Sequence, residues 1–217
     1  MSNPSREPLI SNISHQKMDH HQSRTLVVLT GPVGVGKSTS ANAAARDLRA
    51  SGASVACLDL DQLYCMVRQR DGFDDQATWR AARQTAAVLV DHFFERVASV
   101  VIVEGGFLTE AEQHDLIDQL HSQPHTLFVT LHASFDTVHA RVMADIDPHR
   151  VASKVPAFLK HLYTAEYEAA LPFLRGATTC IDVENSDVEQ VGKQIAELIK
   201  SSGILPFVKY GARKQKE

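Results

Sequence analysis

Short apolar segments alternate with segments of helical periodicity from residue 24 onward. Runs rich in Val, Ile and Leu, short enough to be buried strands, occupy residues 25–30, 54–58, 99–103, 126–131 and 178–183. Apolar residues at helical spacing predict helices at residues 37–51, 76–98, 110–122, 135–144, 155–170 and 188–201. Because each parallel connection needs a crossover segment, usually a helix, this alternation predicts an α/β fold with a parallel sheet covered on both faces.

The length and composition fit one domain without a membrane span. The chain has 217 residues, of which 44% are hydrophobic and 22% charged, as is ordinary for a globular protein. We expect the folded domain to cover residues 24–205, between a disordered polar leader at 1–23 and a basic tail at 206–217. The leader lacks the apolar core of an export signal, and no apolar run approaches the ~20 residues of a membrane span.

Charge and cysteine content favour a cytoplasmic enzyme. The net charge of −4 argues against a protein whose main partner is nucleic acid. Cys57, Cys65 and Cys180 show no CxxC spacing, and two of them, Cys57 and Cys180, fall in predicted strands. We therefore interpret these two as small buried residues in a reducing compartment.

Residues 31–38 carry the strongest motif of the chain. They read G-P-V-G-V-G-K-S, which fits the phosphate-binding pattern G-x-x-x-x-G-K-[ST] in full, and they lie between a predicted strand and a predicted helix. Glycines let the backbone approach phosphate oxygens, and the helix N-terminus adds positive partial charge. Lys37 is the expected catalytic cation for the β- and γ-phosphates, and the Ser38 hydroxyl the expected Mg²⁺ ligand. The predicted nucleotide-binding set is Gly31, Val33, Gly34, Val35, Gly36, Lys37, Ser38 and Thr39.

Other motifs of P-loop proteins are missing. The sequence has no N-K-x-D element to read guanine, no D-x-x-G switch and no LSGGQ-type signature. A GTPase would need the first two and a transport ATPase the third, so the sequence favours neither class.

Two acids follow the second predicted strand. Asp59 and Asp61 end the run that starts at residue 54, at the edge where parallel sheets bind ligands. In an extended segment residues two apart point to the same side, so we expect both carboxylates to face one site. One would act on the water shell of a metal ion, and the other would accept a proton from a substrate hydroxyl.

With the P-loop, this acid pair resembles the small P-loop kinases of metabolites and antibiotics. These include shikimate and gluconate kinases, adenylylsulfate kinase and chloramphenicol phosphotransferase, and the resemblance covers residues 24–200. Asp59-Leu-Asp61 is similar to the D-x-D of shikimate kinase and the D-G-D-N of adenylylsulfate kinase. The resemblance implies a five-stranded sheet in the order 2-3-1-4-5, a lid over ATP, and Asp61 as the substrate-binding acid and base. It also implies that Asp59 acts on the Mg²⁺ waters.

Glu104, Gly105 and Gly106 end the third predicted strand in the same crevice. Glu104 occupies the position of the Walker B acid, so we expect it to act on the metal. Gly105 and Gly106 resemble the glycine run with which shikimate kinase contacts its substrate. Whether Asp61 or Glu104 is the general base stays open, as does a purely structural role for Glu104 as a helix cap.

The segment after the fourth predicted strand is the lid candidate. Members of the family place one arginine on the helix, to hold adenine, and one in the mobile loop, to stabilise charge on the transferred phosphoryl group. Arg141 and Arg150 fit these two places, and Pro148 breaks the chain between them. The R-x-R-P lid pattern of shikimate kinases is missing, and a surface role for either arginine remains an alternative.

The segment between Asp61 and the long helix lies where these kinases bind the acceptor. Arg68 is the expected ligand of an anionic acceptor, because guanidinium pairs with carboxylate in a bidentate way. The other arginines in this stretch are further candidates, and solvated helix faces are the alternative for each of them: Arg70, Arg80 and Arg83. Three aromatic residues would give the pocket apolar lining: Tyr64, Phe73 and Trp79.

The sequence thus predicts an ATP- and Mg²⁺-dependent kinase that transfers the γ-phosphate to a hydroxyl of a small molecule, as a monomer or homodimer. One alternative is a kinase that acts on a nucleic-acid end or a nucleotide sugar. Another is a non-catalytic module that senses ATP.

Overall fold

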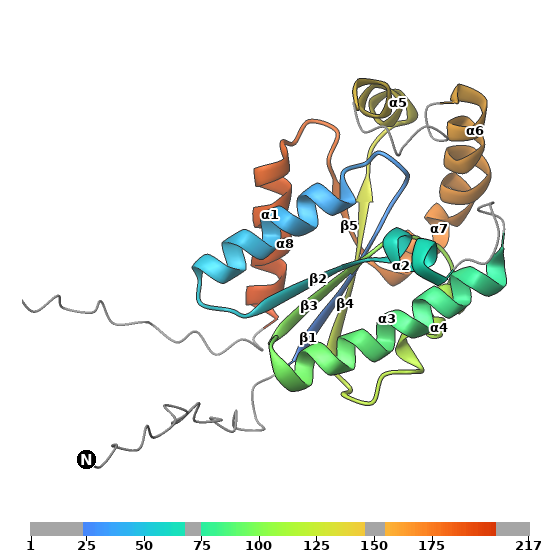
Figure 1. Ribbon diagram of the computed structural model, residues 1–217. Coiled ribbons are helices and arrows are strands. Elements are labelled where there is room, and N and C mark those ends of the chain that lie inside the picture. Colours follow the sequence, from blue (N-terminus) through green and yellow to red (C-terminus); the bar gives the residue numbers. More distant parts are fainter. Residues whose placement is uncertain (1–23, 68–74, 146–154, 203–217) are drawn as a thin grey trace, which may run out of the picture.

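The five predicted strands form one parallel sheet. The computed structural model describes residues 24–67, 75–145 and 155–202. Within them the sheet has the order β2-β3-β1-β4-β5, and every pairing is parallel, as the sequence and its resemblance predict (Figure 1). The strands are β1 Thr25–Thr30, β2 Val55–Asp59, β3 Val100–Glu104, β4 His125–His132 and β5 Thr179–Asp182.

Helices cover both faces of the sheet. They are α1 Lys37–Ala50, α2 Leu60–Val67, α3 Gln76–Arg96, α4 Glu110–Ile117, α5 Phe135–Ala144, α6 Pro156–His161, the π-helical segment η3 Leu162–Glu168, α7 Ala169–Ala177 and α8 Val188–Ser201. Helices α1 and α8 cover one face of the sheet, and α3 and α4 cover the other (Figure 1). Strand β1 is buried along its whole length, and its side chains alternate between the two cores: Val27 and Leu29 pack towards α1 and α8, Leu26 and Val28 towards α3 and α4.

The structure differs from the sequence prediction at α2. Leu60–Val67 was not predicted as a helix, yet Leu60, Leu63 and Tyr64 are buried at helical spacing. The segment follows β2 with no glycine or proline between them, so the usual signal of a new element is missing. The helical segment predicted at 155–170 is also longer in the structure, because α6 continues through η3 and α7 to Ala177.

The interpretation of both strand cysteines as buried residues was wrong for Cys180. Cys180 is exposed and Cys57 is half-buried. Strand β5 is a short strand at the edge of the sheet, and three of its four residues are exposed. An apolar run therefore marked the strand correctly but not its coverage, which depends on neighbouring elements.

Some predictions fall outside the described residues, among them the leader at 1–23 and the tail at 206–217. Within the part of the chain that the structure describes, no helix is long and apolar enough to cross a membrane.

Helices α1 and α8 pack closely where Gly192 meets Ala43 and Ala44. A Cβ at Gly192 would lie 2.4 Å from the Cβ of Ala43 and 2.8 Å from the amide nitrogen of Ala44. We expect Gly192→Ala to lower the free energy of unfolding by about 1–3 kcal/mol, because the added methyl group overpacks this contact. Chemical denaturation measures the change.

Gly176→Ala in α7 is the matched control, because a Cβ there meets nothing within 4 Å. The better helix propensity of alanine should leave this variant unchanged or more stable by up to about 1 kcal/mol. Equal stability of the two variants would contradict the close packing of α1 and α8.

Candidate active site

Neighbouring elements leave no room to replace two of the three glycines that shape the P-loop. Gly31, Gly34 and Gly36 have φ of 144°, 81° and 103°. A Cβ at Gly31 would lie 2.5 Å from the carbonyl oxygen of Leu131 in β4, and one at Gly34 would lie 2.3 Å from Val142 Cγ2 in α5. The loop is therefore wedged between β4 and α5. Gly34, which the phosphate-binding pattern does not require, is fixed by this packing.

The loop has groups ready for phosphate at the start of α1. Gly36 is the N-cap of α1 and offers no side-chain hydrogen bond to the first turn. The Lys37 ammonium folds back over the loop and donates to the carbonyl oxygens of Gly31 at 3.1 Å and Pro32 at 3.2 Å. A cation thus lies over the loop that opens the N-terminus of α1, and P-loops bind the phosphates of a nucleotide with these groups.

Carboxylates collect beside Lys37 at the carboxyl ends of the central strands. Glu104 ends β3 and pairs in register with Asp59 at the end of β2 and with Leu29 in β1. Its side chain is buried, and Ser38 at the start of α1 lies close enough to influence its pKa. Burial raises the pKa of Glu104, and the charges of Asp59 and Asp61 add to this, whereas Lys37 and Ser38 oppose it.

The structure corrects the prediction that Asp59 and Asp61 share an extended segment. Asp59 ends β2, but Asp61 lies in the first turn of α2. Asp59 Oδ1 accepts hydrogen bonds from the amides of Asp61 at 2.9 Å and Gln62 at 3.3 Å, so Asp59 caps α2. Both acids still lie close enough to Glu104 to affect its pKa. Asp59 therefore approaches Glu104 from the end of a strand, and Asp61 approaches it from the start of a helix.

Gly105 and Gly106 have different surroundings. Gly105 has φ 157°, and a Cβ there would lie 2.5 Å from the Cβ of Leu60, at the start of α2. Its amide donates to the Leu29 carbonyl at 3.1 Å. Gly106 has nothing within 4 Å of a Cβ position. Gly105 therefore serves the close packing of α2, and Gly106 borders open space.

Arg141 lies on α5, beside the P-loop. Its guanidinium donates to the carbonyl oxygens of Val35 in the loop at 3.1 Å and of Val183 after β5 at 2.9 Å. The predicted adenine-binding arginine therefore joins the phosphate-binding loop to the end of β5.

Comparison with known proteins gives the family. Residues 23–151, more than half of the chain, match the family model described as adenylylsulphate kinase. The chain belongs to the adenylylsulphate kinase family. An adenylyl-sulfate kinase of Bacillus licheniformis is 45% identical over 62 residues, a stretch that covers 29% of this chain and 30% of that enzyme.

Solved structures of P-loop kinases share the fold. A shikimate kinase from Acinetobacter baumannii in complex with shikimate has a TM-score of 0.56 and 18% identity, covering 83% of this chain and 96% of that one. A gluconokinase from Sinorhizobium meliloti has a TM-score of 0.52 and 19% identity, covering 84% and 98%. The predicted resemblance to small P-loop kinases is thus confirmed at the level of family and fold.

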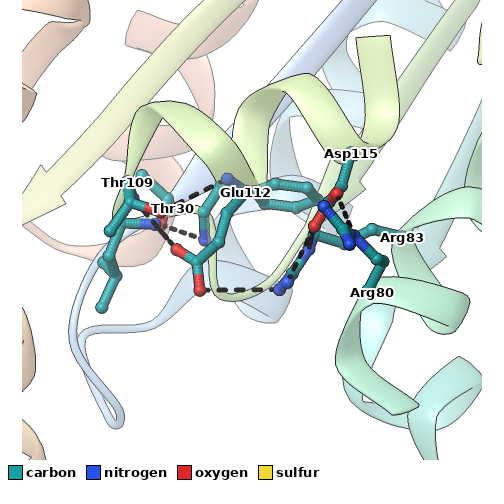
Figure 2. A network of polar contacts seen from close by, with 8 residues as sticks. Thr30, Arg80, Arg83, Thr109, Glu112 and Asp115 are labelled. Atoms are coloured by element: carbon teal, nitrogen blue, oxygen red, sulfur yellow. Dashed lines mark hydrogen bonds and ion pairs between the residues drawn. The ribbon is translucent and has the colours of Figure 1, made fainter. Parts of the chain in front are cut away.

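Two arginines that the sequence offers as candidate ligands of the acceptor form ion pairs with acids of the same chain instead. Arg80 and Arg83 of α3 contact Asp115 of α4 at 2.8 Å and 3.1 Å, and Arg83 also lies 3.6 Å from Glu112 (Figure 2). Their charges are therefore compensated within the protein.

Two of the three aromatic residues predicted to line the pocket belong to the hydrophobic core. Tyr64 is buried and stacks on Trp79, with ring centroids 4.0 Å apart. The other predicted site residues of this region and of the lid lie outside the described residues: Arg68, Arg70, Phe73, Pro148 and Arg150.

The carboxylate that secures α5 was not predicted from the sequence. Glu184, which follows β5, accepts hydrogen bonds from the amide and hydroxyl of Ser134 at 2.7 Å and 2.8 Å and from the Thr137 hydroxyl. Its partners lie about 50 residues earlier, so only the S-x-x-T cap at the start of α5 is visible in the sequence. The backbone amide of Ser134, then the hydroxyls of Thr137 and Ser134, lower the pKa of Glu184 to about 2.

We expect Gly105→Ala to lower the free energy of unfolding of this protein by about 1–3 kcal/mol, because the methyl group would collide with Leu60 and strain the backbone. Gly106→Ala is the control in the adjacent position and should leave the melting temperature unchanged. Thermal unfolding of both variants decides the matter, and a Gly105→Ala variant as stable as the parent would disprove the tight contact with α2.

Glu184→Gln should lower the melting temperature at neutral pH. The lowered pKa means that the ionised carboxylate stabilises the fold above the unfolded-state value of 4.5, and that this gain is lost as pH falls towards about 2. The difference in melting temperature between parent and variant should therefore be constant above about pH 5.5 and shrink below it.

Glu189→Gln provides the control, because Glu189 forms only an exposed ion pair with Arg46 on α1. It should change the melting temperature little at any pH. A pH-independent effect of Glu184→Gln would show that the ionised carboxylate is not what secures α5.

Proposed function

We propose that this chain is an ATP- and Mg²⁺-dependent kinase that transfers the γ-phosphate to a hydroxyl of a small molecule. One observation carries the proposal: the P-loop cation, a serine hydroxyl and three carboxylates all lie at the carboxyl ends of β1, β2 and β3 or in the helices that start there. The register of β1, β2 and β3 and the influence of Lys37, Ser38, Asp59 and Asp61 on the pKa of Glu104 support placing these groups in one site. A phosphoryl-transfer enzyme needs this set, because its catalysis is mostly positioning and charge stabilisation.

The residues fit the proposed cofactors. Ser38, Asp59 and Glu104 offer only oxygen donors, which Mg²⁺ prefers. No cluster of three or more His, Cys, Asp or Glu arranged to hold a metal occurs among residues 24–67, 75–145 and 155–202. Mg²⁺ usually binds one or two carboxylates together with substrate phosphates and water, so such a cluster is not required. When bound, ATP supplies the phosphoryl group and Mg²⁺ neutralises charge on its phosphates.

The chain's own groups divide the work. Lys37 would exchange the carbonyls of Gly31 and Pro32 for phosphate oxygens. Asp61 is exposed on the first turn of α2, whereas Glu104 is buried at the end of β3, beside Lys37 and Ser38. A general base must reach the proton that it removes, so we assign the base to Asp61 and the metal side of the site to Glu104.

The acceptor belongs to the proposal too. Adenylyl sulfate is the substrate in the name of the matched relative, and shikimate is bound in one structure of the same fold. With Arg80 and Arg83 paired to acids, neither is a free cation for an anionic acceptor. A panel should therefore include adenylyl sulfate, neutral sugars and polyols, aminoalcohols, nucleosides and nucleic-acid 5′ ends. The free cysteines agree with a cytoplasmic location.

Asp61→Asn is expected to lower kcat for the best acceptor by about 10²–10⁴-fold, because it removes the base while keeping the shape of the side chain. Its affinity for ATP should change less than about threefold, since the lost interaction acts in the transition state. ADP release under saturating MgATP, together with calorimetric ATP binding, measures both quantities. Lys37→Met serves as the control that loses phosphate contacts directly.

Three outcomes would contradict the proposal. If no acceptor of the panel raises ADP release above basal hydrolysis, the kinase assignment is wrong. Tight ATP binding with no turnover, unchanged in Asp61→Asn, would indicate an ATP sensor. Turnover only with nucleic-acid ends or nucleotide sugars would replace the small-molecule acceptor with these substrates.

A further inference from the structure

A network of charged side chains lies under the loop that connects β3 to α4. Arg83 of α3 is only 3% exposed, although arginine is rarely buried unless it is paired. Its Nε and Nη2 approach Asp115 Oδ2 at 3.2 Å and 3.1 Å, and its Nη1 lies 3.6 Å from Glu112 Oε1 (Figure 2). Arg80 contacts the other oxygen of Asp115 at 2.8 Å. Burial disfavours the charge of Asp115, but the hydrogen bonds from both arginines outweigh it and hold the pKa of this carboxyl below its usual range.

Glu112 connects this network to the backbone of the loop. One of its oxygens, Oε1, faces Arg83, while Oε2 accepts from the amides of Leu108 at 2.7 Å and Thr109 at 3.0 Å. Glu112 and Thr109 also form a capping box at the start of α4. The carboxylate is therefore oriented from two sides, by a buried cation and by two loop amides.

The same loop is bonded to the nucleotide side of the site. The Phe107 amide donates to the Thr30 hydroxyl at 3.2 Å, and Thr30 immediately precedes the P-loop (Figure 2). The Gly105 amide donates to Leu29 in β1. Residues 105–109 thus run from Glu104 past the start of α2, with the backbone tied to β1 on one side and to α4 on the other.

We propose that Arg83 is a positioning residue of the phosphoryl-transfer site, which acts through Glu112 to hold residues 105–109 against the acceptor side. This inference rests on the proposed function. Arg83 does not contact the reacting groups. Through the loop it sets the position of Gly105 and Gly106. Gly106 borders open space, and Gly105 packs against Leu60, the residue before Asp61. A shift of about 1 Å in such a support can cost about 10²-fold in rate.

The main test is amide hydrogen exchange of the full chain with peptides that cover residues 105–112. Arg83→Met should speed exchange at Leu108 and Thr109 about tenfold or more, because Glu112 loses the cation that orients it. Arg80→Met is the matched control: Arg80 shares Asp115 but does not contact Glu112, so loop exchange should stay within about threefold. Faster exchange spread evenly over the chain, or equal effects of the two variants, would overturn the proposal.

Steady-state kinetics provide a second test, with MgATP and the alcohol of the acceptor panel that gives the highest turnover. Arg83→Met should lower kcat/KM for the acceptor about tenfold or more and change KM for ATP less than about threefold. Arg83→Lys keeps the charge but not the planar fork, so it should recover part of the loss. Equal losses for acceptor and ATP would indicate a general loss of structure and overturn the positioning role.

A double-mutant cycle tests whether Arg83 acts through Glu112. Glu112→Gln keeps an oxygen for the two loop amides but removes the charge that faces Arg83. The effect of Arg83→Met on acceptor kcat/KM should shrink at least about threefold in the Glu112→Gln background, and full additivity would contradict the inference.

If Arg83→Met does not fold, Arg83→Lys and Glu112→Gln provide the same comparison. Hydrogen exchange needs no turnover. If the parent phosphorylates no alcohol, the kinase proposal fails, while the exchange data still decide the role of Arg83.

Discussion

The parallel register of the sheet is the constraint on which the site depends. It sets Leu29, Glu104 and Asp59 side by side in three adjacent strands, so that the loops that follow these strands begin at one edge. The P-loop follows the first, the glycines at 105 and 106 the second, and α2 the third. A shift of one residue in β3 would turn Glu104 to the opposite face and separate it from Ser38 and Lys37. Charges that belong to distant parts of the sequence thus meet because strands of the same direction end together.

Close contacts then fix what the register has brought together. A methyl group would clash with β4 at Gly31, with α5 at Gly34 and with α2 at Gly105, so only glycine fits at these positions. Each contact joins a loop of the site to an element that carries another part of it. Arg141 makes the corresponding polar connection from α5 to the P-loop and to the end of β5. The site is therefore supported by packing around its loops as well as by the sheet beneath them.

Sequence periodicity predicted the fold well, because strands buried on both faces and helices with one buried face leave clear patterns. The P-loop was equally visible, since its chemistry needs fixed residue types at fixed spacing. The α2 helix was not predicted, because Asp59 caps it with no intervening loop signal. The pairing of Arg83 with Asp115 is decided by how α3 and α4 pack, which no local pattern records. Tertiary contacts between charged residues, rather than the elements themselves, limited the prediction of the site.

The junction between β2 and α2 has a consequence for motion. Leu60 begins the helix directly after Asp59 ends the strand, so no flexible residue lies between the sheet and the helix that carries Asp61. In many enzymes hinge residues absorb a change in backbone angles at such a place. Here no linker residue is available, so such a change would have to fall on Asp59 or Leu60 themselves, and Leu60 is fully buried. For the proposed kinase, this means that side chains and the far end of α2 would accommodate acceptors of different size, while Asp61 stays close to the edge of the sheet.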